Sequence, residues 1–244
     1  MKIFIILLSF LSFFVSCGYR ADNNKEYIAD KEDGIREYDK NFKEGYIKTE
    51  DGVNLYYRFF YNDENNRLLV LNHKENSSLE EWEIMINLFL REGYNIMQYD
   101  MRGYGKSKGE KDLSKYISDL EIITGYAFNN MQTISHIVFI GNGFGGNIVL
   151  YSSKKYCNDN TSFVILSPDL ENEEFKIDLF NKYCDNSKYL FLYSGMDLEG
   201  VDEVRFIYNY ENIKTYIDRI NDYSGVDLLI NNPLFLRKIL NTND

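Results

Sequence analysis

A buried strand that runs through a glycine turn directly into a helix is the feature of this sequence that most restricts its fold. Residues 137–140 are apolar, glycines follow at positions 141, 143, 145 and 146, and a helical pattern continues to Tyr156. Glycine in such a turn permits backbone conformations and close contacts that a side chain would forbid. The turn has neither the spacing of a dinucleotide-binding G-x-G-x-x-G motif nor the lysine of a Walker A loop. It therefore predicts a strand–turn–helix unit of an α/β protein.

Similar units recur along the rest of the chain. Strands are expected at 45–49, 53–60, 67–72, 94–99, 137–140, 162–166, 189–193 and 213–217, with helices at 79–91, 113–131 and 146–156. The first two strands flank Glu50-Asp51-Gly52, a hairpin signal, and the later strands alternate with helices, which is typical of parallel sheets. We expect residues 44–244 to form one α/β domain, with a mostly parallel eight-stranded sheet covered by helices on both faces. Because only about twenty residues separate the strands at 162–166 and 189–193, no cap domain is expected.

The first 43 residues are expected to lie outside this domain. Lys2 precedes an apolar run that ends at Val15, which is typical of a signal peptide and shorter than the roughly 20 residues that span a bilayer. The run leads into Phe14-Val15-Ser16-Cys17-Gly18, which resembles the lipobox of bacterial lipoproteins with Phe14 at the usual leucine position. We interpret residues 1–16 as a lipoprotein signal peptide and residues 17–43 as a lipidated N-terminus and polar tether. The alternative is an ordinary signal peptide with an incidental cysteine.

These features predict an exported protein that lipid on Cys17 anchors to a membrane of the cell envelope. A net charge of −11 argues against nucleic-acid binding, which normally uses a basic face. The histidines and cysteines do not form a metal-ligand pattern, so neither a metal nor a cofactor is expected. Cys157 and Cys184 each follow Lys-Tyr shortly before an expected parallel strand. Export permits a disulfide between them, but the sequence leaves open whether they pair or remain free thiols.

Four motifs resemble the α/β-hydrolase superfamily, in particular the capless serine hydrolases related to lysophospholipases and serine aminopeptidases. The motifs are residues 49–52, residues 72–74 at the family's oxyanion turn, residues 100–109 at its D-x-R-G-x-G-x-S-x-G loop, and residues 141–146 at its G-x-S-x-G nucleophile elbow. The likeness covers roughly residues 45–240. It implies the α/β-hydrolase fold and, in an intact member, ester or peptide hydrolysis by a serine, an acid and a histidine.

The resemblance also identifies the chain as a degenerate member. Gly143 stands at the nucleophile position, and Ser224, just before Gly225, stands where the relatives carry the histidine. The family's chain order is nucleophile, acid, histidine, yet both histidines of this chain, at positions 73 and 136, precede Gly143. Asp197 aligns with the acid, although it is equally well explained as a turn aspartate. The serines at 107, 152, 153 and 167 have no expected histidine partner.

Part of the site is expected to survive as an oxyanion-hole-like group. Its donors are backbone N–H groups, which do not depend on side-chain identity, from Phe144 and from the stretch that includes His73 and Lys74. The sequence therefore favours a non-catalytic binding or scaffolding lipoprotein that holds a small carbonyl or carboxylate ligand; it names no protein partner. The first alternative is a hydrolase with weak or unorthodox activity, in which Asp197, Asn142 or tyrosines would position the attacking water. The second is a purely structural envelope protein.

Overall fold

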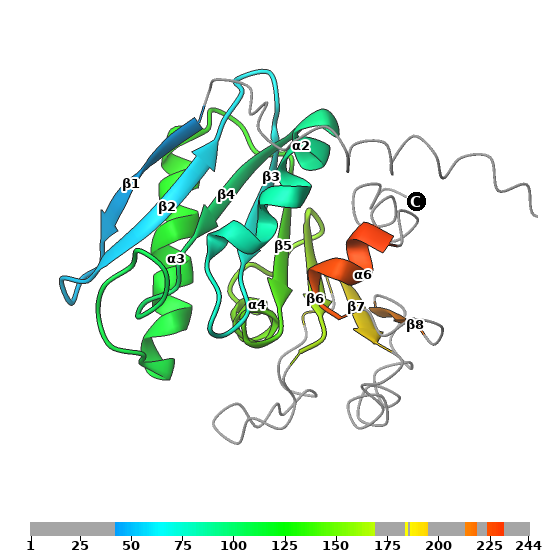
Figure 1. Cartoon of the computed structure of the whole chain (residues 1–244). Coiled ribbons are helices and arrows are strands. Elements are labelled where there is room, and N and C mark those ends of the chain that lie inside the picture. Colours follow the sequence, from blue (N-terminus) through cyan, green and yellow to red (C-terminus); the bar gives the residue numbers. More distant parts are fainter. Residues whose placement is uncertain (1–41, 169–183, 185, 195–212, 219–223, 232–244) are drawn as a thin grey trace, which may run out of the picture. The chain divides into compact units, whose positions relative to one another are not determined.

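The computed structural model describes residues 42–168, 184, 186–194, 213–218 and 224–231 (Figure 1). Its elements in chain order are β1 (Phe42–Lys48), β2 (Asn54–Phe60), β3 (Arg67–Asn72), the 3-10 helix η2 (Leu79–Trp82), α2 (Glu83–Arg91), β4 (Tyr94–Tyr99), α3 (Leu113–Asn130), β5 (His136–Asn142), α4 (Phe144–Ser152), β6 (Thr161–Leu166), β7 (Lys188–Ser194), β8 (Ile213–Asp218) and α6 (Val226–Asn231). None of these helices is long and apolar enough to cross a membrane.

The strands form one eight-stranded sheet in the order β1-β2-β4-β3-β5-β6-β7-β8. β1 pairs antiparallel with β2, and β2 pairs antiparallel with β4. Every other neighbouring pair is parallel, from β3–β4 through to β7–β8. The mostly parallel eight-stranded sheet is therefore confirmed. No cap is present among the residues that the structure describes between β6 and β7.

Several element boundaries differ from those that the sequence predicts, and most of the differences are one or two residues. β1 begins at Phe42, before the expected domain start at 44, because Phe42 pairs with Phe60 and the two ring centroids lie 5.4 Å apart. The helix expected at 79–91 begins as η2 and continues as α2. α4 starts at Phe144, directly after the glycine turn, and ends four residues before the expected end at Tyr156.

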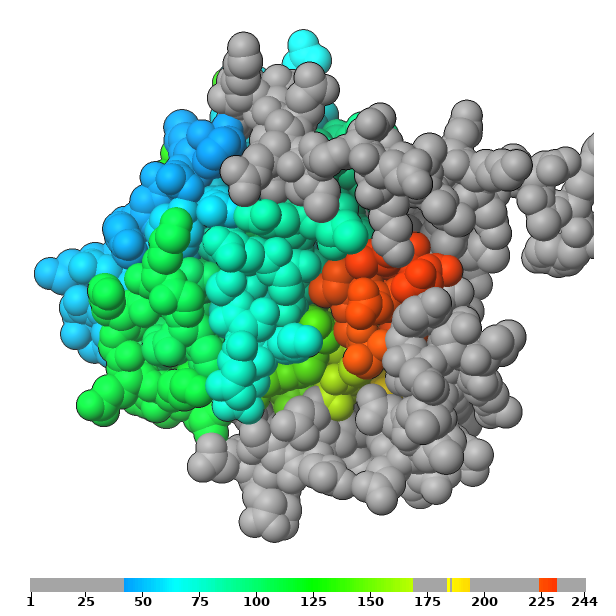
Figure 2. Space-filling model, viewed as in Figure 1, coloured from blue at the N-terminus to red at the C-terminus, as the bar shows by residue number. Residues whose placement is uncertain are grey.

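Helices cover both faces of the sheet, as Figure 1 shows. On one face, α3 and α4 contribute side chains such as Leu120, Ile123 and Ile148 to a core that includes the aromatic rings of the strands. On the other face, η2, α2 and α6 pack onto residues such as Leu71 and Ile140. In the space-filling view of Figure 2, the α2 segment (turquoise) and α6 (red) lie side by side at the surface of this second layer. The central strand β5 is thus enclosed on both faces, and its carboxyl end carries the glycine turn.

Candidate functional site

The glycine turn joins β5 directly to α4, with Gly143 as the single residue between them. Gly143 has φ 51° and ψ −122°, a left-handed conformation that L side chains rarely adopt. A Cβ atom built at this position would lie 3.4 Å from Lys74 Cβ and 3.9 Å from the carbonyl oxygen of Ser167. The strained backbone of a nucleophile elbow is therefore present, and there is room for a small side chain, but the residue carries no reactive atom.

The glycines on either side of this position are required by the packing of the turn. A Cβ atom at Gly141 would lie 2.3 Å from the carbonyl oxygen of Gly145, in the first turn of α4. A Cβ atom at Gly145 would lie 2.4 Å from the carbonyl oxygen of His73, just beyond β3. Both positions therefore exclude every side chain, which confirms that these glycines serve the turn itself and do not depend on catalysis.

His73 is a buried structural residue with no exposed surface. Its Nε2 accepts a hydrogen bond from the Met101 N–H at 2.9 Å, so the neutral tautomer carries its proton on Nδ1, which donates to the Lys74 carbonyl oxygen at 2.7 Å. Burial lowers the pKa of His73 to about 4. Because both ring nitrogens have protein partners, His73 holds the oxyanion turn against the loop after β4 and cannot act as a general base for the elbow.

The carboxylate of Glu81 binds one of the expected oxyanion-hole donors. Glu81 Oε1 accepts hydrogen bonds at 3.1 Å from the Lys74 N–H and at 3.1 Å from Nδ2 of Asn142. Its second oxygen is buried and has no hydrogen-bond partner, and burial raises the pKa of this carboxyl group. The expectation that the Lys74 N–H is available to a ligand is therefore wrong, because an internal carboxylate occupies it.

Phe144, the other expected oxyanion-hole residue, lies in the first turn of α4. Its ring is 5% exposed and packs edge-to-face on Tyr116, with the ring centroids 5.3 Å apart. The side chain therefore belongs to the core, whereas the backbone of Phe144 lies directly after Gly143 at the helix N-terminus, where the helix dipole favours negative charge.

The segment that carries Ser224 comes to the elbow, as the resemblance implies. Ser224 is exposed and lies two residues before the start of α6 at Val226. The next residue, Gly225, has φ 58°, and a Cβ atom there would lie 2.4 Å from Oδ1 of Asn142, the residue before Gly143. The Gly225 N–H also donates to the Ser167 hydroxyl at 3.2 Å. Ser224, which the resemblance aligns with the family's histidine, thus directly precedes a residue that contacts the elbow.

The Arg-Gly loop at 100–109 is a scaffold for this region. The carboxylate of Asp100 accepts the Leu79 N–H and the Lys106 N–H, both at 2.7 Å, which ties the loop to the start of η2. The Ser107 hydroxyl donates to the Asp100 carbonyl oxygen at 2.6 Å and accepts the Tyr56 N–H at 2.8 Å. Ser107 is therefore structural.

The guanidinium of Arg102, in the same loop, forms ion pairs with two carboxylates. Its Nε lies 2.6 Å from Oδ2 of the buried Asp119 on α3, and its Nη1 lies 2.8 Å from Oδ2 of Asp51 in the hairpin turn. Arg102 is 3% exposed. The buried charge of Asp119 is thus compensated, and the motif fastens α3 and the hairpin to the loop beside the elbow.

The remaining predicted residues divide into two groups. Ser152 and Ser153 are buried at the end of α4, in packing positions as expected. Asp197 and Cys17 lie outside the described residues, so their roles stay predictions. Within the described ranges, no group of three or more His, Cys, Asp or Glu residues could hold a metal ion.

Glu81 is the site residue that the sequence analysis missed. It lies in Leu79-Glu80-Glu81-Trp82, where acidic residues in the first turn of a helix are usually explained by the helix dipole. No sequence signal distinguishes the half-buried Glu81 from the exposed Glu80 beside it. Only the approach of η2 to Lys74 and Asn142 reveals its position.

Comparison with known proteins agrees with this geometry. Residues 67–191 match the family model described as alpha/beta hydrolase fold. This chain belongs to the α/β-hydrolase family. A bifunctional esterase/perhydrolase of Acinetobacter calcoaceticus is 26% identical over 125 residues, which are 50% of this chain and 43% of the relative. A proline iminopeptidase of Saccharolobus solfataricus is 30% identical over 127 residues, 50% of this chain and 39% of that enzyme. The α/β-hydrolase chain thus spans less than half the length of these two curated relatives.

Solved structures extend the likeness of this α/β-hydrolase chain beyond the matched segment. An esterase of Pyrococcus furiosus aligns with a TM-score of 0.61 and 20% identity, covering 81% of this chain and 88% of the esterase. A protein of Butyrivibrio proteoclasticus, solved with ferulic acid bound, aligns with a TM-score of 0.64 and 19% identity, covering 80% of this chain and 99% of that protein. At these identities the comparison establishes the fold alone.

Proposed function

We propose that this chain is an exported, membrane-anchored member of the α/β-hydrolase family that binds a ligand at the degenerate elbow without hydrolysing it. The observation that carries the proposal is the combination at Gly143 of the elbow's backbone conformation with the absence of any side-chain nucleophile. Ser224 beside the elbow and the fully engaged His73 leave the described part of the site without a general base near neutral pH.

The proposed ligand is a small neutral carbonyl compound, such as an ester or amide. Oε1 of Glu81 already accepts the Lys74 N–H beside the elbow. A carboxylate ligand would bring a second acid group next to this one and would have to displace it from the donor. A neutral carbonyl group brings no charge of its own, and the start of α4 after Gly143 provides a favourable dipole for its oxygen.

The anchoring part of the proposal rests on the lipobox-like sequence at Cys17 and on the chemistry of the other two cysteines. Cys157 and Cys184 form a disulfide, with their Cα atoms 5.6 Å apart. Disulfides persist in oxidising compartments and are rare in the reducing cytosol. The pair therefore supports export independently of the N-terminal sequence.

The test of the catalytic part uses activity-based labelling and restored residues. A fluorophosphonate probe is expected to leave the wild-type chain unlabelled, because no activated serine is expected. Gly143→Ser alone should also give negligible ester turnover, since the general base is still missing. The double variant Gly143→Ser with Ser224→His is the variant expected to recover measurable esterase activity, provided that Asp197 supplies the acid.

The same assays test the alternative that the chain is a weakly active hydrolase. Turnover of an ester or peptide panel by the wild-type chain, abolished by Asp197→Asn or Asn142→Ala, would replace the binding proposal with unorthodox catalysis. Asn147→Ala, a change at a buried residue of α4, serves as a control for nonspecific loss of structure.

A further inference from the structure

A concave site lies at the opposite end of β5 from Gly143. The hollow measures about 380 Å³ and is bounded by the end of α3, the segment between α3 and β5, and the segment between α4 and β6. Its lining includes Phe128 from α3 and His136 at the start of β5. Because β5 runs from His136 to Asn142, the strand rise places the two sites about 20 Å apart. The hollow is therefore separate from the degenerate elbow.

The lining of the hollow mixes polar and apolar residues and is uncharged. None of the described residues that line it is Asp, Glu, Lys or Arg, although 27% of the chain is charged. Its polar groups include the amides of Gln132 and Asn160 and the hydroxyl of Thr133. Burial, with Arg67 and Lys188 nearby, lowers the pKa of His136 to about 4, so this imidazole is neutral at physiological pH. Such a surface offers hydrogen bonds without an ionic partner for a charged ligand.

An aromatic ring stands at the edge of these polar groups. Phe128 is 37% exposed, and its ring is perpendicular to that of Tyr156, with the centroids 6.5 Å apart. Tyr156 in turn packs on Phe139 of β5 at 4.7 Å. The partly exposed ring is thus held in place by the core, and its apolar surface is available to the C–H groups of a ligand.

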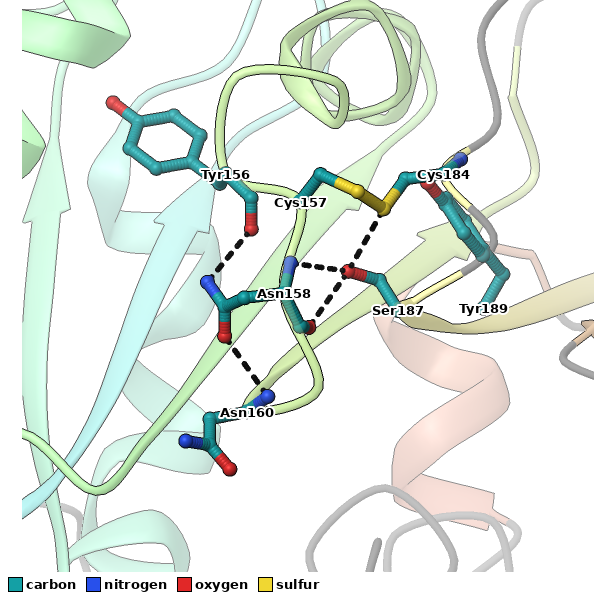
Figure 3. Close-up of a disulfide and its surroundings, with 7 residues drawn as sticks. All are labelled: Tyr156, Cys157, Asn158, Asn160, Cys184, Ser187 and Tyr189. Atoms are coloured by element: carbon teal, nitrogen blue, oxygen red, sulfur yellow. Dashed lines mark hydrogen bonds between the residues drawn. A yellow bond between two sulfur atoms is a disulfide. The ribbon is translucent and has the colours of Figure 1, made fainter.

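The loop that carries Asn158 and Asn160 is fastened to the segment before β7. Figure 3 shows the Cys157–Cys184 disulfide beside Asn158, whose N–H donates to the Ser187 hydroxyl at 3.2 Å while its carbonyl oxygen accepts from the same hydroxyl at 3.0 Å. The Asn158 amide is used within the loop, because its Oδ1 accepts the Asn160 N–H at 2.9 Å. The side-chain amide of Asn160 points away from this network (Figure 3), and the residue is exposed.

From this arrangement we propose that the hollow binds a neutral carbohydrate. Hydroxyl groups of a sugar match the mixed donors and acceptors of Gln132, Thr133 and Asn160, and the C–H face of a sugar ring matches the exposed ring of Phe128. No residue of the lining itself carries a charge that could pair with a phosphorylated or uronic-acid ligand. The volume of about 380 Å³ lies in the usual range of small-ligand sites and accommodates one or two sugar rings.

A peptide fits this hollow less well than a sugar. Extended peptides are commonly held by addition to an open sheet edge. The strands that reach this hollow are paired on both sides, since β5 lies between β3 and β6, and β6 lies between β5 and β7. No strand edge is therefore open to a peptide backbone at this place.

The test uses the purified full chain in detergent on an array of neutral and acidic oligosaccharides, with a peptide array in parallel. Titration calorimetry with the strongest neutral oligosaccharide then compares the variants. Phe128→Ala should weaken binding at least tenfold, which corresponds to about 1.4 kcal/mol or more. Asn160→Ala should weaken it about threefold to tenfold, which corresponds to roughly 0.7–1.4 kcal/mol. Phe42→Ala removes an aromatic ring of matched exposure, 39%, from β1 and should leave the affinity unchanged.

Several outcomes would overturn the proposal. These are a correctly folded wild-type chain that binds no neutral oligosaccharide, binding of acidic glycans or peptides in their place, and equal losses in Phe128→Ala and Phe42→Ala. If Phe128→Ala melts at a much lower temperature than wild type, the affinity of Asn160→Asp is measured in its place. This variant keeps the loop backbone and adds one charge. Unchanged affinity in that variant would also contradict the site. Because Gly143 lies at the other end of β5, Gly143→Ser should leave this binding intact whatever it does to the elbow.

Discussion

At the scale of single residues, Gly143 combines the geometry of a catalytic turn with the least reactive side chain available. Its φ of 51° is readily adopted by glycine and disfavoured for other residues. Glycine at this position avoids the strain that a side chain would impose, and it carries no nucleophilic atom. A serine here would trade some stability for reactivity.

The first residue-scale prediction follows from this strain. Gly143→Ser should lower the free energy of unfolding by about 1–3 kcal/mol, because the new Cβ atom enforces a rarely populated backbone conformation. Gly125→Ser is the matched control, since Gly125 lies within α3 and a Cβ atom there meets nothing within 4 Å. Urea denaturation measures the free energy of unfolding of both variants and of wild type. A Gly143→Ser chain as stable as wild type would remove the support for an elbow at this position.

His73 leads to a prediction about pH. Unfolded histidine takes up a proton near pH 6.5, whereas burial lowers the pKa of folded His73 to about 4. Between these values the unfolded chain binds more protons, so the contribution of His73 to stability is complete above pH 6.5 and is lost as the pH falls toward 4. The loss should reach about 2 kcal/mol at pH 5 relative to pH 7.5.

Thermal melts from pH 7.5 to pH 5 measure this effect. His73→Gln should be less stable than wild type at pH 7.5, because the two ring hydrogen bonds are removed. It should also lose less stability on acidification, since the titrating group is gone. Parallel pH profiles of wild type and variant would show that His73 is not the group responsible.

At the scale of elements, the disulfide joins the segment after α4 to the segment before β7. It closes a loop with a sequence separation of 27 residues, and the Ser187 hydroxyl links the same two segments through Asn158. The bond adds a covalent connection beside the parallel pairing of β6 with β7. It therefore stabilises the part of the sheet that leads from the elbow strand toward the C-terminus.

The element-scale prediction concerns this bond. The double variant Cys157→Ser with Cys184→Ser should lose about 2–4 kcal/mol of unfolding free energy, and wild type in reductant should match it. Thiol titration of the unreduced chain should find neither cysteine free. Two reactive thiols at these positions, with no effect of reductant on stability, would contradict the disulfide and withdraw its support for export.

At the scale of the whole molecule, the first described element is β1, which begins at Phe42 and thus close to the expected end of the tether at 43. We predict that Cys17 is lipidated and that its acyl chains hold the domain at a membrane. Each buried CH₂ contributes about 0.8 kcal/mol, so several acyl chains anchor firmly whereas one does not.

Metabolic labelling with a fatty-acid analogue and membrane fractionation test this anchoring. Cys17→Ser should abolish acyl labelling and release the chain from the membrane fraction. Cys157→Ser, which removes a different cysteine, is the control and should keep the label. Membrane retention of Cys17→Ser in the absence of any detectable lipid would refute the lipoprotein interpretation.

The order of the elements and the sheet that they form followed from the sequence because their signals are local. Alternating apolar strands and helices predict a parallel sheet, and the glycines at 141 and 145 predict a turn that admits no side chain. The missing nucleophile at Gly143 and the absence of any histidine after it are also readable directly from the chain. These properties depend on residue identity and on spacing along one segment.

Only the tertiary structure decided which segments far apart in the chain come into contact. Glu81 binds the Lys74 N–H and Asn142 because η2 packs beside the carboxyl ends of β3 and β5, and the pairing of Cys157 with Cys184 depends on the neighbouring positions of β6 and β7. Sequence patterns report the face of an element that is buried, because burial repeats with the period of that element. They do not report which polar groups meet there, since a hydrogen bond depends on the distance and direction between two atoms that only the folded chain brings together.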